Sequence, residues 1–574
     1  MSFIVLQRTK RGRVYAYQTT TLWNPKKKHT FQRRVYLGRL DPHTHKVIPG
    51  RQRGEETGPG LALSQLKKAV AAGGDTVLKL LHATRGKGQT NKTSQVLDAS
   101  PIAEVAEPGA FHVVGQIAAA TGLEATLQRV LGQRAAAQLL LLAAYQLTQA
   151  TPLYLARSWM ERILGATVLA KQGFCGDGDL LEQLGADTPR RMKLLREWAA
   201  QRKHPRALVY DITSISTYSQ LLDLAEYGYN RDGESLAQVN LALVHDRADG
   251  LPLFYRVLPG SISDVSTLKL TDELMREFGF RDFHFVMDRG FFSQSNLAAM
   301  LNHNTGFTMA IPLNSTQARN FIRQRRASIG KAKNAFAWQG LPMHHLGGVW
   351  QVQLPAGKPA ECDAHLYFDS KHKADEEGRF LGWILLVEER AGSEKFAFVR
   401  EAFRWLNDNA GALKGYFSVR QAGENNWRIQ RKNNAVAQRT GTMGLTLILT
   451  TQARQTREEV LADYRDRDQA EKAFDIFKNE NGQSRLHIST REQAEGRLLL
   501  AFLTLIVSSN LDRRMRQAGL YKQYTTAEVF AELAKIRALR LANGEVKLLE
   551  ISKKQRTLLE KLALPPLTPD MVIN

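Results

Sequence analysis

Three acidic residues stand where chemistry on phosphates could take place. Asp211 follows a short apolar run that ends in Val-Tyr, Asp288 ends the apolar run Phe283–Asp288, and Glu471 lies in a later segment with helical periodicity. Two strands that end in Asp, with a Glu carried across by a helix, can bring three carboxylates to one point. Mg²⁺ prefers such oxygen ligands. Two Mg²⁺ ions roughly 4 Å apart can activate an attacking oxygen and stabilise a leaving one in phosphodiester cleavage.

The segment around Glu471 carries the most specific pattern. Tyr464, Arg467, Glu471 and Lys478 follow one another at offsets of 0, 3, 7 and 14. At about 100° per residue, a helix places all four within an arc of about 60°. We expect Glu471 to hold metal, and Arg467 and Lys478 to neutralise phosphates on either side. Tyr464 can stack on the DNA or hydrogen-bond to a phosphate.

Each of these residues also has an ordinary explanation. Asp211 could cap a helix, and Asp288 could be a turn residue before Gly290. The stripe around Glu471 could be a surface ladder of ion pairs, because Arg–Glu pairs four residues apart are common on helices. The joint placement of all three carboxylates on suitable elements favours the metal site.

The elements that must position these residues alternate between strands and helices. Strands are predicted at Ala207–Asp211, Ala237–His245, Leu253–Leu258, Phe283–Asp288, Gly306–Pro312 and Leu445–Thr451, and helices at Leu268–Phe278, Ser293–Asn302 and about 457–479. Thr456 and Glu459 form a capping-box signature at the start of the last helix. This order predicts an α/β fold of the RNase H-like kind, a mixed sheet with helices on both faces.

Composition divides the rest of the chain. We predict a basic β-rich N-terminal DNA-binding module (1–60), a linker (61–100), a helical domain (101–204), the core in two parts (205–313 and 441–510), a β-rich insertion (314–440) and a helical C-terminal region (511–574). The N-terminal prediction rests on basic residues interleaved with aromatic ones, namely Lys10, Arg11, Arg13, Lys26, Lys27, Lys28, Arg33 and Arg34.

The overall charge points to a polyanionic partner. The 574 residues include 79 Lys plus Arg and 56 Asp plus Glu, a net charge of +23. Such a surplus creates a long-range positive potential that favours nucleic acid, with acidic membranes as the main competitor. The longest apolar runs, Leu139–Tyr145 and Leu498–Val507, are far shorter than the roughly 20 residues that span a bilayer. The two cysteines, Cys175 and Cys362, are far apart in the sequence, which predicts neither a disulfide framework nor a zinc site. We therefore expect the protein in a reducing cytoplasm.

The pattern Y-x₂-R-x₃-E-x₆-K, complete here, resembles the YREK signature of the cut-and-paste DDE transposases of bacterial insertion sequences. The blocks VYDITSIS and FHFVMDRGFFSQSNL resemble the strands that carry that group's two Asp residues, and the resemblance covers about 205–510. The chain departs from the group at Leu486, where a Pro is usual.

The resemblance implies an RNase H-like core of the retroviral integrase superfamily that holds two Mg²⁺ ions, for which Mn²⁺ can substitute. It implies cleavage of double-stranded DNA at transposon inverted-repeat ends through a hairpin intermediate, strand transfer into target DNA, and a homodimer that pairs two ends. Trp338 and Trp350 are candidates to stabilise a flipped base. The expected place is the bacterial cytoplasm, in association with the nucleoid. The alternatives are a transposase-derived DNA-binding regulator and a nuclease without transposition.

Overall fold

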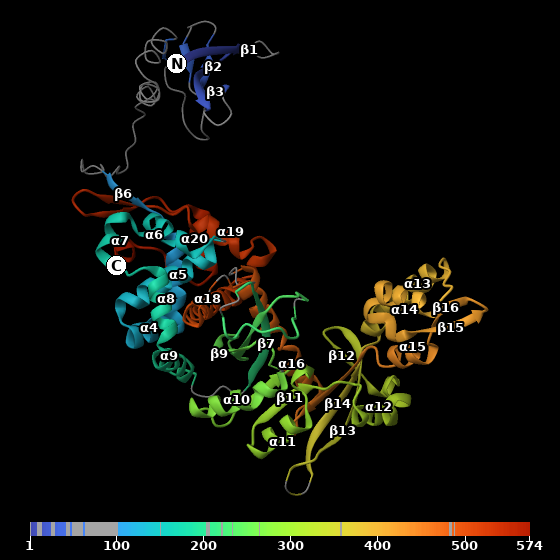
Figure 1. The fold of residues 1–574 in the computed structure, drawn as a ribbon. Coiled ribbons are helices and arrows are strands. Elements are labelled where there is room, and N and C mark those ends of the chain that lie inside the picture. Colours follow the sequence, from blue (N-terminus) through green and yellow to red (C-terminus); the bar gives the residue numbers. More distant parts are fainter. Residues whose placement is uncertain are drawn as a thin grey trace. The chain divides into compact units, whose positions relative to one another are not determined.

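The computed structural model divides the chain into two compact units, residues 1–99 and 100–574 (Figure 1). It describes residues 2–8, 14–24, 29–41, 46–48, 61–62, 102–149, 151–202, 207–219, 222–231, 233–262, 264–355, 357, 359–480, 485–486, 488 and 490–573.

The first unit contains a five-stranded antiparallel sheet. Its strands, in sheet order, are β1 (Ser2–Arg8), β2 (Val14–Asn24), β3 (His29–Leu40), β4 (Lys46–Ile48) and β5 (Leu61–Ala62). Ala16, Leu37 and Val47 are buried in it. The basic residues Lys10, Arg11, Arg13 and Lys26–Lys28 lie outside the described residues, as do the side chains of Arg33 and Arg34 and nearly all of the predicted linker.

The second unit begins with a short strand and a group of helices. These are β6 (Ile102–Ala106), α3 (Gly109–Thr121), α4 (Leu123–Leu131), α5 (Gln133–Thr148), α6 (Ala156–Leu164), α7 (Ala166–Gln172), α8 (Asp177–Ala186) and α9 (Thr188–Ala200). Figure 1 shows α5 and α8 beside the long helix α18 (Arg491–Gln517). α18 is long and apolar enough to cross a bilayer, but 83% of its apolar window is buried inside the protein. Packing therefore accounts for its apolar character.

The centre of the second unit is a large mixed sheet. Its main path runs β12-β13-β14-β17-β11-β10-β7-β8-β9, with β18 (Arg485–Leu486) paired to β7. The central strands are β7 (Leu208–Thr217), β8 (Gln238–Asp246), β9 (Pro252–Pro259), β10 (His284–Met287), β11 (Gly306–Ala310) and β17 (Leu445–Thr450). β10 runs parallel to β7 and β11, whereas β7, β8 and β9 are antiparallel neighbours. The helices α10 (Asp264–Glu277), α11 (Gln294–Asn302) and α12 (Thr316–Ile329) complete a mixed α/β architecture.

The segment predicted as a β-rich insertion is instead mixed. The strands β12 (Ala335–Trp338), β13 (Leu341–Val352) and β14 (Ala360–Phe368) extend the main sheet, because β14 pairs with β17. The segment also contains α12, α13 (Ser370–Gly392), α14 (Val399–Ala410), the hairpin of β15 (Phe417–Gly423) and β16 (Asn426–Arg431), and α15 (Asn433–Thr440).

The piece Gly382–Glu388, predicted to be β-prone, lies inside α13. Its Ile384 and Val387 continue a buried stripe that begins at Phe380. This spacing of four and three residues is helical, and it outweighs the local β-propensity of the side chains.

The C-terminal region, predicted to be helical, also contains strands. After α19 (Thr526–Leu533) come β19 (Ala538–Leu541) and β20 (Val546–Leu548), followed by α20 (Lys553–Lys561) and α21 (Pro569–Ile573). β19 pairs with β6, so this short sheet ties the end of the chain to the start of the second unit. A partner more than 400 residues away is not visible in a local pattern.

Two buried histidines predict sensitivity to acid. His245 in β8 and His284 in β10 are at most 4% exposed, and burial lowers the pKa of each from 6.5 to about 4. Both are neutral in the folded protein but become charged in the unfolded chain below about pH 6.5. Between about pH 6.5 and pH 4, the folded state therefore binds fewer protons than the unfolded chain. The stability that these two histidines contribute is fully present above pH 6.5 and is lost as pH falls towards 4.

We expect the urea midpoint to fall between pH 7 and pH 4.5, and His245→Leu to make that fall shallower. An unchanged pH dependence in this variant would contradict the assignment. His372→Leu is the matched control, because the side chain of His372 is 61% exposed.

Candidate active site

Asp211 lies within β7, which continues for six more residues, rather than at the strand end that the sequence predicts. β10 pairs with β7 only at Leu208 and Val209, so Asp211 lies just beyond the end of that parallel pair. Its Oδ1 accepts a hydrogen bond of 2.9 Å from the backbone N–H of Ile212. Burial, above all, raises the pKa of Asp211 to about 7, and the negative charge of Asp288 acts in the same direction.

Asp288 directly follows β10, as predicted. The short helix η2 (Arg289–Phe291) begins at the next residue, and Phe291 packs against Tyr210 with ring centroids 4.9 Å apart. Asp288 Oδ1 accepts a hydrogen bond of 3.3 Å from the Tyr464 hydroxyl. The strand end is thus joined to the segment that leads into the helix of Glu471.

The sequence predicts one continuous helix over about 457–479, but the structure divides this segment into three. α16 (Arg457–Arg465) begins with the predicted capping box of Thr456 and Glu459; after a turn comes α17 (Asp468–Asp475), then a π-helical turn, η5 (Ile476–Glu480). Arg467 keeps right-handed helical backbone angles in the turn, so the direction of the chain is maintained. The π-helical turn contains more residues per turn, so half-buried Lys478 leaves the angular position predicted for a regular helix.

Arg467 connects two of the three carboxylates. Its Nη1 lies 3.3 Å from Asp288 Oδ2, and its Nη2 lies 2.6 Å from Glu471 Oε1. The guanidinium carbon lies 5.7 Å from the ring centroid of Tyr464. The side chain of Arg467 is 16% exposed, whereas that of Glu471 is 53% exposed. The structure therefore brings Asp288, Tyr464, Arg467 and Glu471 into direct contact, and Asp211 is near enough for its charge to act on Arg467.

The chemistry of the three candidate carboxylates, though not their spacing in this structure, suits a hard divalent ion. Asp211, Asp288 and Glu471 offer only carboxylate oxygens, the ligands preferred by Mg²⁺. Burial makes the charged form of Asp211 costly, and a nearby cation would stabilise it. In the arrangement described, Arg467 supplies positive charge to the site. Among the described residues, no group of three His, Cys, Asp or Glu side chains is gathered closely enough to hold a metal ion by itself.

Arg467→Ala should weaken DNA binding and lower the slope of log affinity against log salt by about one, because one phosphate contact is lost. Arg467→Lys is the matched variant: it keeps the charge but loses the fork that contacts two groups at once. We expect the lysine variant to keep the wild-type salt slope while binding more weakly. Equal slopes for wild type and Arg467→Ala, measured by titration with labelled DNA, would place Arg467 away from the phosphates.

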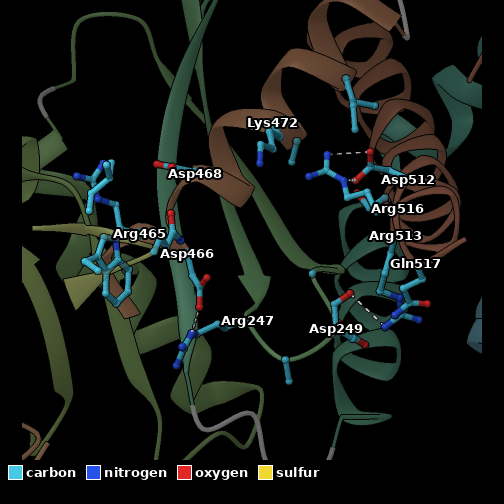
Figure 2. Close-up of a pocket in the computed structure, with 18 of the residues that line it drawn as sticks. Arg247, Asp249, Arg465, Asp466, Asp468, Lys472, Asp512, Arg513, Arg516 and Gln517 are labelled. Carbon is cyan, nitrogen blue, oxygen red and sulfur yellow. Dashed lines mark hydrogen bonds and ion pairs between the residues drawn. The ribbon is translucent and has the colours of Figure 1, made fainter. Parts of the chain in front are cut away.

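A separate cleft of about 700 Å³ lies on another face of the Glu471 helix (Figure 2). Asp468 and Lys472 of this helix and Arg465 at the end of α16 line it, but none of the three candidate carboxylates does. On its wall, Arg247 pairs with Asp466 at 2.6 Å. Other wall residues are Asp249, Asp512, Arg513 and Arg516, so cationic and acidic side chains balance one another. The candidate carboxylates and this cleft are therefore separate features of the structure.

The two candidate tryptophans have different surroundings. Trp350 is 1% exposed and packs against Phe321, with ring centroids 6.2 Å apart. It is therefore closed to a DNA base in this structure, because its position in β13 turns it towards α12. Trp338 is half-buried and lines the cleft.

One cationic residue near the site was not singled out from the sequence. Arg231 donates a hydrogen bond of 3.2 Å from Nη1 to the Ser214 hydroxyl, and its positive charge acts to lower the pKa of Asp211. The only local signal is its place in the loop Tyr-Gly-Tyr-Asn-Arg.

One comparison with known protein families covers this part of the chain. A family model described as a transposase DDE domain matches residues 202–507, just over half of the sequence. No curated protein matches. Among solved structures, the chain is similar to the piggyBac transposase in a synaptic complex with hairpin DNA, at 10% identity and a TM-score of 0.32. That similarity covers 81% of this chain and 86% of the other.

Proposed function

The chain belongs to the family of transposase DDE domains, and from that premise we propose that it cuts DNA at the inverted-repeat ends of an insertion sequence and joins them to target DNA. The observation that carries the proposal is the contact of Arg467 with both Asp288 and Glu471, beside Asp211. Asp288 after β10 and Glu471 in α17 both contact Arg467, and the charge of Asp211 within the neighbouring strand β7 acts on the same guanidinium.

Asp211, Asp288 and Glu471 would hold the divalent ions. When bound, two Mg²⁺ ions, or Mn²⁺ in their place, activate the attacking oxygen and stabilise the leaving one. Arg467 can turn its guanidinium from the carboxylates to a substrate phosphate, which it binds in the same forked geometry. The hydroxyl of Tyr464, now donated to Asp288, keeps that carboxylate oriented. Lys478 would neutralise a phosphate farther along the strand.

The sheet supports an RNase H-like core for this chemistry. The antiparallel strands β7, β8 and β9 are followed by β10 and β11, both parallel to β7. We infer that two copies of the chain pair two transposon ends, that excision passes through a DNA hairpin, and that Trp338 is the better candidate to receive a flipped base. The net charge of +23 supports DNA as the partner.

A strand-transfer assay tests the proposal against its rivals. The protein is incubated with Mg²⁺, a supercoiled plasmid and precut DNA carrying the inverted repeat that flanks its gene. We expect covalent joining of the 3′-OH end to the plasmid, and none from a matched 3′-deoxy end. Cutting of uncut ends without joining would indicate a nuclease, and binding without either reaction would indicate a transposase-derived regulator.

A further inference from the structure

Two tyrosine rings project into solvent from a firmly held loop near the carboxylate site. Tyr227 is 78% exposed and Tyr229 is 83% exposed, among the highest values for large hydrophobic residues in the described part of the chain. We propose that these two rings form a stacking surface for unpaired bases of the DNA strand next to the cleavage position. This inference rests on the proposed function, because it assigns part of the substrate to a surface beside the same site.

The two exposed rings flank a glycine that lies against the protein. A Cβ on Gly228 would overlap the backbone of Gly260, so Gly228 faces the protein. Tyr227 and Tyr229 flank this position with their rings exposed, and only glycine fits between them.

The backbone of the loop is pinned on both sides. Glu226 exchanges two backbone hydrogen bonds of 3.0 Å with Gln238. The Gln238 side chain donates to the carbonyls of Tyr229 and Gly260, each at 3.0 Å. Asn230 donates to the Ser216 hydroxyl at 3.1 Å. Because the backbone of this loop is already ordered, it would lose little conformational entropy when a ligand binds. An ordered loop of this kind is suited to binding.

The loop is also connected to the strand that carries Asp211. Arg231 bonds to Ser214, three residues beyond Asp211 on β7, which corresponds to on the order of 10 Å along the strand. One loop therefore combines two exposed rings with a guanidinium whose charge acts on Asp211. Interleaved aromatic and cationic groups are the features by which proteins bind single-stranded nucleic acid, since every base has a face that can stack.

The expected occupant is an unpaired base rather than duplex DNA. Bases inside a duplex are already stacked on one another, so their faces are not open to a protein ring. Stacking of one base on an aromatic ring changes affinity by roughly 5- to 150-fold. A strand that is opened at the cleavage position would supply such bases next to the carboxylates.

The experiment compares two end DNAs that differ only in three flanking base pairs at the cleavage position, paired in one and mismatched in the other. Affinities are measured in EDTA for the full chain, so that binding is separated from cutting. We expect wild type to prefer the mismatched end, and Tyr227→Ala/Tyr229→Ala to lose about 10-fold or more of that preference. The double phenylalanine variant should retain it, because stacking needs the ring and not the hydroxyl.

Tyr154→Ala is the matched control, since Tyr154 is 81% exposed but lies among the N-terminal helices of the second unit. It should behave as wild type. A double alanine variant that keeps the wild-type preference, or a wild type that cuts the end but has no preference, would overturn this inference alone. A wild type that binds neither end would overturn the proposed function as well.

Discussion

Asp288→Asn should reduce metal-dependent cutting of inverted-repeat DNA by at least about 10³-fold, while the affinity for the same DNA in EDTA changes little. An amide has nearly the shape of the carboxylate but lacks the charge that a divalent ion needs. It can still accept one hydrogen bond from Tyr464 or Arg467, which now contact Asp288 at 3.3 Å each. The fold should therefore survive the change, and the loss should fall on the rate of cutting in a single-turnover assay.

Asp211→Asn and Glu471→Gln should give losses of the same order. Asp468→Asn is the control, because Asp468 begins the same helix but lines the separate cleft. It should leave the rate of cutting close to that of wild type. Near-normal cutting by any of the three site variants would remove that residue from the metal site.

Gly496→Ala should lower the free energy of unfolding by about 2–3 kcal/mol, the usual effect of forcing extra volume into a packed interior. Gly496 in α18 and Gly185 in α8 lie where the two helices cross, and a Cβ on either would overlap the backbone of the other helix. An alanine side chain at Gly496 would therefore force α8 and α18 apart, and these two helices pack against each other in the helical part of the second unit. Equilibrium urea unfolding measures the change.

Gly115→Ala is the same substitution at a helical position with open space around it, in α3. There alanine should stabilise the protein by about 0.5–1 kcal/mol, because it favours the helix more than glycine does. We therefore expect the free energy of unfolding to fall in Gly496→Ala and to rise in Gly115→Ala. This difference tests whether α8 and α18 cross in close contact. A similar change in both variants would show that α8 and α18 can separate at little cost.

Much of the arrangement could be predicted from local patterns. An apolar run that ends in Asp288 predicts a buried strand with an acid at its edge, and the structure has β10 at His284–Met287. The capping box of Thr456 and Glu459 marks the start of α16 because it is a local hydrogen-bond pattern. These features depend on residues a few positions apart, so one sequence is enough to find them.

The other features depend on contacts between distant segments. β7 continues past Asp211 because β8 pairs with it along its length, and no local signal marks that pairing. The break after Arg465 leaves Asp466 bonded to Arg247, which lies 219 residues away. Trp350 and Trp338 have similar local sequences but different burial, since the packing of α12 decides which is covered. The loop that carries Tyr227 and Tyr229 is held by hydrogen bonds from Gln238 and Ser214 to the carbonyl of Tyr229, and sequence alone does not show these contacts.

The most direct test of the central claim is a cleavage assay with uncut linear DNA that carries the inverted repeats flanking the gene. The wild-type protein is incubated with Mg²⁺ or with EDTA, and the product ends are mapped to the nucleotide. We expect cuts at the repeat boundary with Mg²⁺ and none with EDTA. Protein that binds the repeats but leaves them intact with Mg²⁺ and with Mn²⁺ would contradict the assignment of Asp211, Asp288 and Glu471 as a working metal site.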